Sequence, residues 1–348
     1  MDDDFLARLG SLALRKDNNQ DTRSRTLQRE LDGSGFRIFE CVSDHGYFEW
    51  KPPYGLSIQN ISGITSKEMI LQYLDVNGKP GNLVDPKKVR TPRRFLTMPP
   101  YETESKFPYA KLDAVGLHVA AKHRGVSLDD IDFGFGGSTL EMLANCDNTD
   151  PFMVTKVPGT KNFLLVVKSK DYVADHAGFG FQFERLMTGI RMDDLKNATS
   201  AKEHLHEMNV GEYRVLFRAE TDAIQRGSPV EIKASNPRYW GTKVMFQMIS
   251  SGSTKLCHGT KARGELTGVS VQSLQQVVRS SARGDHIKFL ERNILDGMKS
   301  IHDQMKGADP GNVFKISFDR SGSLCLLPVR GRSGDILPPA DVVRELIE

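Results

Sequence analysis

The residues of this chain that could carry chemistry gather between positions 184 and 233. Glu184 ends a Gly-Phe-Gln-Phe-Glu run, and Glu220 and Asp222 flank a threonine. Glu231 and Lys233 flank an isoleucine. Carboxylates in such apolar frames tend to lie at the end of a core, where an unpaired charge is costly unless a cation or another partner meets it. The pattern therefore predicts a site that holds a cation.

Two β-like runs carry most of these residues. Residues 213–224 and 230–234 are rich in β-branched and aromatic side chains, and residues 225–229, Gln-Arg-Gly-Ser-Pro, predict the turn of a hairpin between them. Because alternate residues of a strand face the same side, the two acids of the first run share a face, as do the acid and the lysine of the second. All four can therefore converge.

The donor set points to hard divalent cations. Mg²⁺ and Mn²⁺ prefer oxygen ligands, and a two-metal site holds its ions about 3.5–4 Å apart to stabilise the attacking and the leaving oxygen. We therefore expect Mg²⁺ or Mn²⁺, in a site of two ions. The candidate ligands are four carboxylates and one backbone carbonyl: Glu184, Glu220, Asp222, Glu231 and the carbonyl of Ile232.

An Asp followed after a short turn by Glu-x-Lys is also the arrangement of metal-dependent nucleases, whose lysine lies at the scissile phosphate. Lys233 would orient the attacking water or neutralise charge growing on the phosphate. Hydrolysis of a phosphodiester is therefore the leading hypothesis. The alternative is a solvated hairpin whose acid and lysine pairs have no catalytic role.

Three motifs together resemble those of the DXO family, the eukaryotic decapping and 5′-end exoribonuclease proteins. The run from Gly180 to Glu184 resembles its Gly-apolar-x-apolar-Glu motif. Residues 220–222 are similar to its Glu-apolar-Asp motif, and residues 231–233 to its Glu-apolar-Lys motif. Order and spacing agree. The resemblance covers residues 35 to 330, and the motifs are specific as a set.

Two flanking segments extend the resemblance. An arginine ahead of Pro100-Tyr101-Glu102 matches the family's active-site arginine, which places it at Arg90, with Arg93 or Arg94 as alternatives. Gln247 takes the place of the glutamine that a family helix supplies beside the metals. The residues that the resemblance assigns to RNA binding are Arg90, Arg93, Arg94, Lys233 and Gln247.

The chain also departs from the family pattern. Thr221 replaces the apolar residue between the two acids, and the segments around Arg90 and Gln247 lack the tryptophans associated with the family. These differences indicate a diverged member, such as a nematode paralogue, whose substrate pocket differs.

The resemblance implies a reaction on RNA 5′ ends. Family members remove incomplete or unusual caps, release pyrophosphate from 5′ triphosphates and, in some cases, degrade the RNA 5′ to 3′. It also allows a nuclear 5′ exoribonuclease as a partner. The alternative, favoured by the departures near Arg90 and Gln247, is a catalytically weak relative that binds RNA ends or a partner exonuclease and regulates RNA decay.

Composition is compatible with a nucleic-acid partner without requiring one. The net charge is +3, from 47 basic and 44 acidic residues, so a field for RNA must come from local clusters. Residues 87–94 and 255–263 are such clusters, and either could instead be a solvated loop. The first is also similar to a nuclear localisation signal.

Length and patterning predict one large α+β domain, with mixed β-sheets flanked by helices and the Asp…Glu-x-Lys hairpin at its core. Residues 1–34 form an N-terminal arm or surface helix, and residues 35–348 form the catalytic domain. No apolar run approaches the length that spans a bilayer, and the acidic start excludes an ordinary secretory signal. We expect an intracellular monomer, in the nucleus or the cytoplasm.

Periodicity places the remaining elements. Strands are expected at 35–39, 152–157 and 163–168, helices at 111–124, 138–145, 180–187 and 241–250, a long helix at 285–305, and a terminal hairpin at 313–318 and 323–329. Ser138 and Glu141 have the spacing of a capping box. The Gly-Phe-Gly-Gly run at 134–137 predicts a turn before that helix. His204 and His206 lack the partners of a zinc site.

Overall fold

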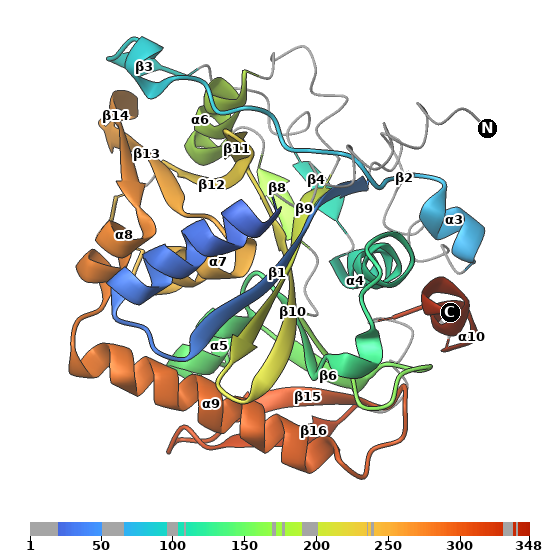
Figure 1. Ribbon diagram of the computed structural model, residues 1–348. Coiled ribbons are helices and arrows are strands. Elements are labelled where there is room, and N and C mark those ends of the chain that lie inside the picture. Colours follow the sequence, from blue (N-terminus) through green and yellow to red (C-terminus); the bar gives the residue numbers. More distant parts are fainter. Residues whose placement is uncertain are drawn as a thin grey trace.

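A nine-stranded mixed sheet runs through the centre of the molecule (Figure 1). Its strands in spatial order are β16 (Leu324–Pro328), β15 (Val313–Phe318), β6 (Phe152–Lys156), β7 (Leu164–Lys168), β5 (Phe133–Gly136), β10 (Tyr213–Glu220), β9 (Ala201–Val210), β1 (Phe39–Trp50) and β2 (Leu74–Asp75). β5 is parallel to both of its neighbours, and the other pairs are antiparallel. The sheet is therefore assembled from sequence-distant segments around one short central strand.

The computed structural model describes most of the chain in separate stretches. These are residues 20–50, 66–95, 104–107, 109–168, 172–175, 178–189, 201–234, 236–237, 240–329, 337–338 and 340–348. The predicted Pro100-Tyr101-Glu102 segment and residues 1–19 of the predicted N-terminal arm lie outside them.

Both faces of the large sheet are covered by helices, because its strands are apolar on both sides. In β10, Val215 and Phe217 face one core and Leu216 the other. The first face carries a helix over residues 20–34, α5 (Thr139–Asn145), α7 (Lys243–Ser251), α8 (Leu274–Ser281) and α9 (Asp285–Met305). The second carries α3 (Lys67–Leu71), α4 (Tyr109–His118), a π-helical turn (Val119–His123) and α10 (Ala340–Ile347).

A five-stranded sheet lies beside the large one. Its strands in order are β11 (Ala223–Gln225), β12 (Ser228–Lys233), β13 (Lys255–Ala262), β14 (Glu265–Ser273) and β3 (Arg93–Arg94). Helix α6 (Phe179–Thr188) packs on it through a separate apolar cluster that contains Phe183 and Met187. A third, two-stranded sheet joins β4 (Glu104–Phe107) and β8 (Tyr172–Asp175). The fold is thus the α+β domain with mixed sheets that the sequence predicted.

Long periodic segments were predicted well. The apolar positions of the 285–305 segment form the buried stripe of α9, and the terminal hairpin is β15 and β16. The helices expected at 111–124, 138–145, 180–187 and 241–250 are all present. Within the predicted arm, residues 20–34 form a helix that buries Leu27 and Leu31 in the main core.

Three local predictions were wrong. The strand expected from Gly35 begins at Phe39. The Ser138 side chain makes no capping hydrogen bond. The predicted turn at 134–137 is mostly the central strand β5, because Gly134 leaves room for Phe163 of the adjoining segment: a Cβ at Gly134 would lie 2.6 Å from the Phe163 ring.

Helices of membrane-spanning length and apolarity are absent from the described part of the chain.

Candidate functional site

The chain crosses from the large sheet to the second sheet at the Glu-Thr-Asp triplet. Glu220 is the last residue of β10, and Ala223 is the first of β11. The Thr221 amide still donates to the Lys202 carbonyl of the large sheet, at 2.9 Å. Asp222 already belongs to the second sheet, because its carboxylate accepts a 2.7 Å hydrogen bond from the Ile232 amide of β12.

This crossing corrects the predicted hairpin. Residues 213–224 are not one strand, so Glu220 and Asp222 do not share its face, and β10 does not pair with β12. The hairpin is β11–β12, with a two-residue turn at Arg226 and Gly227 whose φ values are 53° and 83°. Two positive φ values in succession are those of a type I′ turn, the turn that suits the twist of paired strands.

Glu231 and Lys233 do share one face of β12, as predicted. Their side chains form an ion pair, and the Lys233 Nζ atom also lies 3.9 Å from the Asp222 Oδ2 atom. The Glu231 side chain is 6% exposed and that of Lys233 29%. Burial lowers the pKa of Lys233, but the Glu231 and Asp222 charges outweigh it, so that this pKa lies above its ordinary value. Lys233 is therefore a firmly charged ammonium between two carboxylates.

Glu184 reaches the same region from α6. The preceding residue, Phe183, packs so closely on Gly259 of β13 that a Cβ there would lie 2.8 Å from the ring. This contact holds the helix against the second sheet. Burial, followed by the charges of Asp222 and Glu220, raises the pKa of Glu184 well above its ordinary value.

Burial, with contributions from neighbouring carboxylates, raises the pKa values of three of these carboxyl groups. Although Glu220 is exposed, desolvation by the surrounding protein and the Asp222 and Glu203 charges raise its pKa to about 8. Burial raises the pKa of Glu231 to about 7, with Lys233 opposing the rise and Asp222 adding to it. Three carboxyl groups thus hold protons more tightly than free side chains do, which a bound cation would relieve.

The donor set fits a hard divalent cation in its chemistry. In the described part of the chain, three or more His, Cys, Asp or Glu side chains are nowhere gathered tightly enough to form a metal site as they stand. Glu184, Glu220, Asp222 and Glu231 are oxygen donors with one lysine among them. Burial, followed by neighbouring carboxylate charges, raises the pKa values of Glu184 and Glu220. Ile232 donates its amide to Asp222, and its carbonyl as a ligand stays a prediction.

Gln247 lies on α7, which packs on both β10 and β12. Its Oε1 atom is buried and accepts no hydrogen bond from the described residues. A buried acceptor without a donor is uncommon, and a cation or a donor from a bound molecule would satisfy it. The place of Gln247 beside the acids stays a prediction.

Within the described residues, the three candidate arginines form no ion pair with the four carboxylates of the site. Arg90 follows a short 3₁₀ helix (Pro86–Lys88), and Arg93 and Arg94 form β3, the outer strand of the second sheet. All three side chains are exposed. Arg94 pairs with Glu265 of β14 at 2.5 Å, and no ion pair within the described residues links Arg90 or Arg93 to the carboxylates. Their role in RNA binding stays a prediction.

Glu203 of β9 is a neighbour of the site that sequence reasoning missed. It stands directly opposite Glu220 in the β9–β10 register, and it is buried in an ion pair with Arg218. Gly116 of α4 makes room for that arginine, since a Cβ there would lie 2.4 Å from the Arg218 Cδ atom. No motif marks Glu203, and only the pairing register of the two strands could have found it.

The carboxylates and the lysine lie where a large mixed sheet meets a smaller one. Solved structures with a similar fold include Rai1 and Dxo1 proteins of the DXO family. S. pombe Rai1 matches with a TM-score of 0.57 at 13% identity, over 86% of this chain and 98% of that one. Scheffersomyces stipitis Rai1, in complex with (3′-NADP)⁺ and calcium ion, gives 0.56 at 12%, over 87% and 94%.

K. lactis Dxo1, in complex with manganese, matches with a TM-score of 0.50 at 14% identity, over 84% of this chain and 90% of that one. At these identities the likeness shows a shared fold, and it confirms at that level the resemblance to the DXO family. No protein-family model and no curated protein sequence matches the chain.

Proposed function

We propose that this protein is a divalent-metal-dependent hydrolase that acts on RNA 5′ ends. One observation carries the proposal: Glu184, Asp222, Glu231 and Lys233, which lie on three different elements, converge at the crossing between two sheets. Three carboxylates that lie together are costly to desolvate unless a charged ligand meets them.

The structural neighbours support the choice of cation and substrate. A manganese ion accompanies K. lactis Dxo1, and calcium and a 3′-phosphorylated dinucleotide accompany Scheffersomyces stipitis Rai1. The same fold therefore accommodates hard divalent cations and nucleotides. We propose that this chain binds two Mg²⁺ or Mn²⁺ ions. Their ligands would be the carboxylates of Glu184, Glu220, Asp222 and Glu231.

The charge and position of each residue indicate its proposed role. A divalent cation in such a site lowers the pKa of water and polarises a phosphoryl oxygen. Lys233 would neutralise charge that develops on the scissile phosphate, and Asp222 keeps β12 in place through the Ile232 amide. Gln247 offers an unsatisfied acceptor to a bound donor or cation.

The finer activities follow from the same chemistry. Attack of water on different phosphates of the 5′ end gives removal of incomplete or unusual caps, release of pyrophosphate from a triphosphate, or stepwise 5′ to 3′ degradation. We propose that the protein works as a monomer in the nucleus or the cytoplasm, and that a nuclear 5′ exoribonuclease is a candidate partner.

A second candidate function is that of a catalytically weak protein that binds RNA ends or a partner exonuclease. The exposed Arg90, which forms no ion pair with the carboxylates within the described residues, favours it, because an active-site arginine should face the reacting phosphate.

The test compares purified protein with an Asp222→Ala/Glu231→Ala variant on RNAs that carry monophosphate, triphosphate, unmethylated-cap and dinucleotide-cap 5′ ends, with Mg²⁺ or Mn²⁺. Release of an end group or of nucleotides by the unmodified protein alone supports the hydrolase and identifies its substrate. If the protein binds metal but turns over none of these ends, the hydrolase proposal fails and the binding protein takes its place.

A further inference from the structure

The turn of the β11–β12 hairpin is held from outside its own sheet. The Gly227 carbonyl accepts hydrogen bonds from Tyr47 of β1, at 3.0 Å, and from Arg23 of the helix over residues 20–34, at 3.3 Å. The guanidinium of Arg23 also lies over the Tyr47 ring, 5.4 Å from its centroid. A segment near the start of the chain thus fixes the hairpin that carries Glu231 and Lys233.

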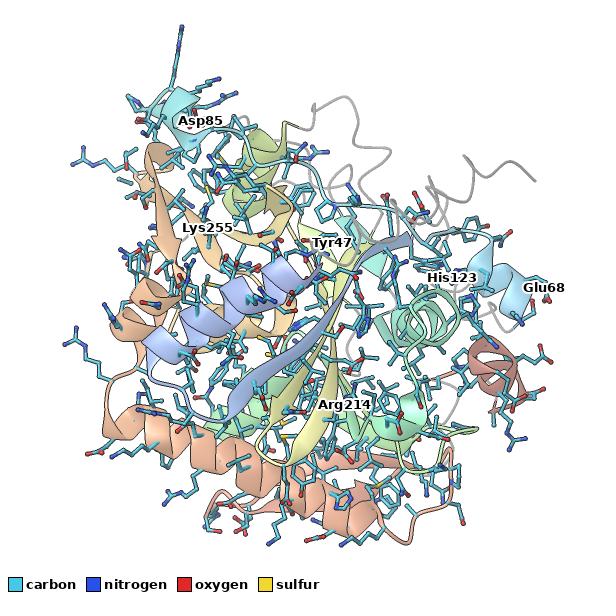
Figure 2. All side chains as sticks on the ribbon, viewed as in Figure 1. Tyr47, Glu68, Asp85, His123, Arg214 and Lys255 are labelled. Carbon is cyan, nitrogen blue, oxygen red and sulfur yellow. The ribbon has the colours of Figure 1, made fainter. Side chains whose placement is uncertain are left out.

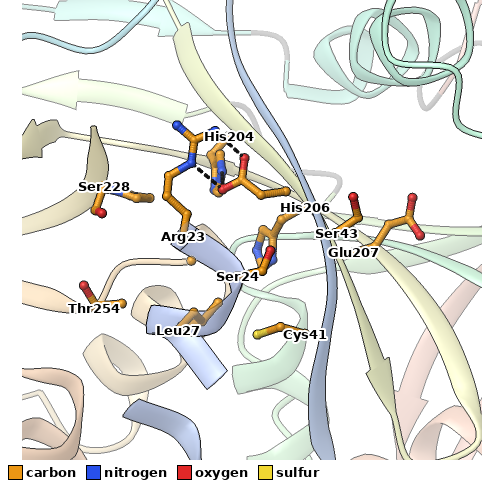
Figure 3. Close-up of a pocket in the computed structure, with 13 residues that line it drawn as sticks. Arg23, Ser24, Leu27, Cys41, Ser43, His204, His206, Glu207, Ser228 and Thr254 are labelled. Carbon is orange, nitrogen blue, oxygen red and sulfur yellow. Dashed lines mark hydrogen bonds and ion pairs between the residues drawn. The ribbon is translucent and has the colours of Figure 1, made fainter. Parts of the chain in front are cut away.

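Asp44 of β1 is the centre of this contact. Its carboxylate accepts two hydrogen bonds of 2.7 Å from Arg23, one of 2.9 Å from the Gly46 amide and one of 3.1 Å from His204 of β9. The side chain is 4% exposed. A bidentate bond of this kind fixes the orientation of the guanidinium as well as its position. Figure 3 shows Arg23 extending from its helix toward His204.

The same group reaches the C-terminal end of α7, the helix of Gln247. His204 contacts the Ser251 carbonyl through its second ring nitrogen, at 2.9 Å, and its ring stacks on that of His206. His206 in turn bonds to the Ser250 carbonyl at 2.8 Å. β1, β9, the 20–34 helix, the hairpin turn and α7 therefore meet in one polar network that is largely shielded from water.

We infer that Arg23, Asp44, Tyr47 and His204, which we call the joint residues, position the second sheet relative to the large one and thereby set the candidate site. The inference rests on the proposed function. Glu220 belongs to the large sheet, whereas Glu231 and Lys233 belong to the second sheet, and Gln247 lies on α7, which packs on both. The joint residues touch no substrate, and they act through the hairpin turn and the end of α7.

The competing explanation is that the network only stabilises the fold. The protein provides a matched control for it within the same sheet, where Arg214 of β10 pairs with the buried Glu207 of β9, which also binds His45 of β1. Figure 2 places Tyr47 and Arg214 well apart along these strands. Loss of either arginine removes one partner of a buried carboxylate, but only Arg23 bonds to the hairpin.

The experiment uses the full chain and three proteins: wild type, Arg23→Gln/Tyr47→Phe, and Arg214→Gln. Two quantities are measured on each, the Kd for Mn²⁺ by calorimetry and the amide hydrogen exchange of residues 223–233. We expect the double variant to bind Mn²⁺ about tenfold more weakly, as loss of residues that orient metal ligands does, with hairpin amides that exchange about tenfold faster. Arg214→Gln should match the wild type in both.

If the double variant and Arg214→Gln had equal Kd values and equal hairpin exchange rates, the inference would be overturned. Loss of any buried ion pair in this sheet would then have the same effect as loss of the joint residues. Faster hairpin exchange with an unchanged Kd would overturn it too, since the joint residues would then secure the turn without setting the site. A wild-type protein that binds no Mn²⁺ would defeat the proposed metal site, and hairpin exchange equal in all three proteins would still overturn the inference on the joint residues.

Discussion

Replacement of Lys233 by methionine tests the electrostatics of the site most directly. The ammonium lies against Glu231 and 3.9 Å from Asp222, and Glu184 and Glu220 also feel its charge. At an effective dielectric constant of about 20, two unit charges at that separation attract by about 4 kcal/mol. Removal of one partner of a buried pair typically costs about 3–5 kcal/mol.

We therefore expect Lys233→Met, measured by urea unfolding in EDTA at pH 8, to lose about 3 kcal/mol of unfolding free energy. The loss is below the full Coulomb energy because the carboxylates can take up protons. Saturating Mn²⁺ should reduce this difference in stability between the variant and the wild type. The variant lacks the competing ammonium and should bind Mn²⁺ about tenfold more tightly, so that saturating metal recovers much of the lost stability.

The matched control is Lys255→Met, on the neighbouring strand β13, where the lysine is exposed and bonds to Gln225. Its unfolding free energy should change by less than about 0.5 kcal/mol. Unchanged stability of Lys233→Met in EDTA would refute the view that the lysine neutralises the acids. A loss that Mn²⁺ fails to recover would show that the carboxylates do not bind a cation.

Four further outcomes are expected. Mn²⁺ affinity should rise between about pH 6 and 9 in calorimetric titrations, because Glu231 and Glu220 lose protons near pH 7 and 8. The metal-free protein should become less stable between about pH 4.5 and 8. A carboxyl whose pKa is raised on folding stabilises the fold below its unfolded pKa, near 4.5, and loses that contribution as pH rises through the folded value. Gly116→Ala should lower the unfolding free energy by about 1–3 kcal/mol, because the new Cβ displaces Arg218 from its carboxylate; a stability equal to that of the wild type would contradict this packing. Burial lowers the pKa of His206 from 6.5 to about 3, so the stability that its neutral ring provides above pH 6.5 should decline as pH falls toward 3, and unfolding curves of His206→Gln should depend less on pH in that window.

Periodic segments were predictable because their pattern repeats over several turns. The stripe of α9 and the alternation of β15 and β16 each repeat the same choice of buried side, so one odd residue does not change the result. The capping box failed because two residues at the right spacing do not fix a rotamer. The central strand β5 was mistaken for a turn because glycine marks close packing as well as turns.

The proximity of the acids could be predicted from the sequence, but the construction of the region that holds them could not. Their role as a site stays a prediction. The acids were found because carboxylates in apolar frames are unusual, whatever strand carries them. The hairpin exists as β11–β12, but the extent of its first strand was predicted wrongly. β-propensity continues through 213–224, whereas the change of sheet at Thr221 depends on the partner strands. The same dependence on pairing hid Glu203, which becomes part of the site only through the register with β10.

The short crossing between the sheets also limits how the molecule can open. From Glu220 to Ala223 the chain advances three residue steps, which span at most about 11 Å when fully extended. The two sheets cannot slide apart at this point without breaking strand pairs in one of them. Any opening motion between them must therefore be a hinge rotation about this crossing. Such a rotation would leave Glu220 and Asp222 close together, while Glu184 would move with the second sheet, on which α6 packs.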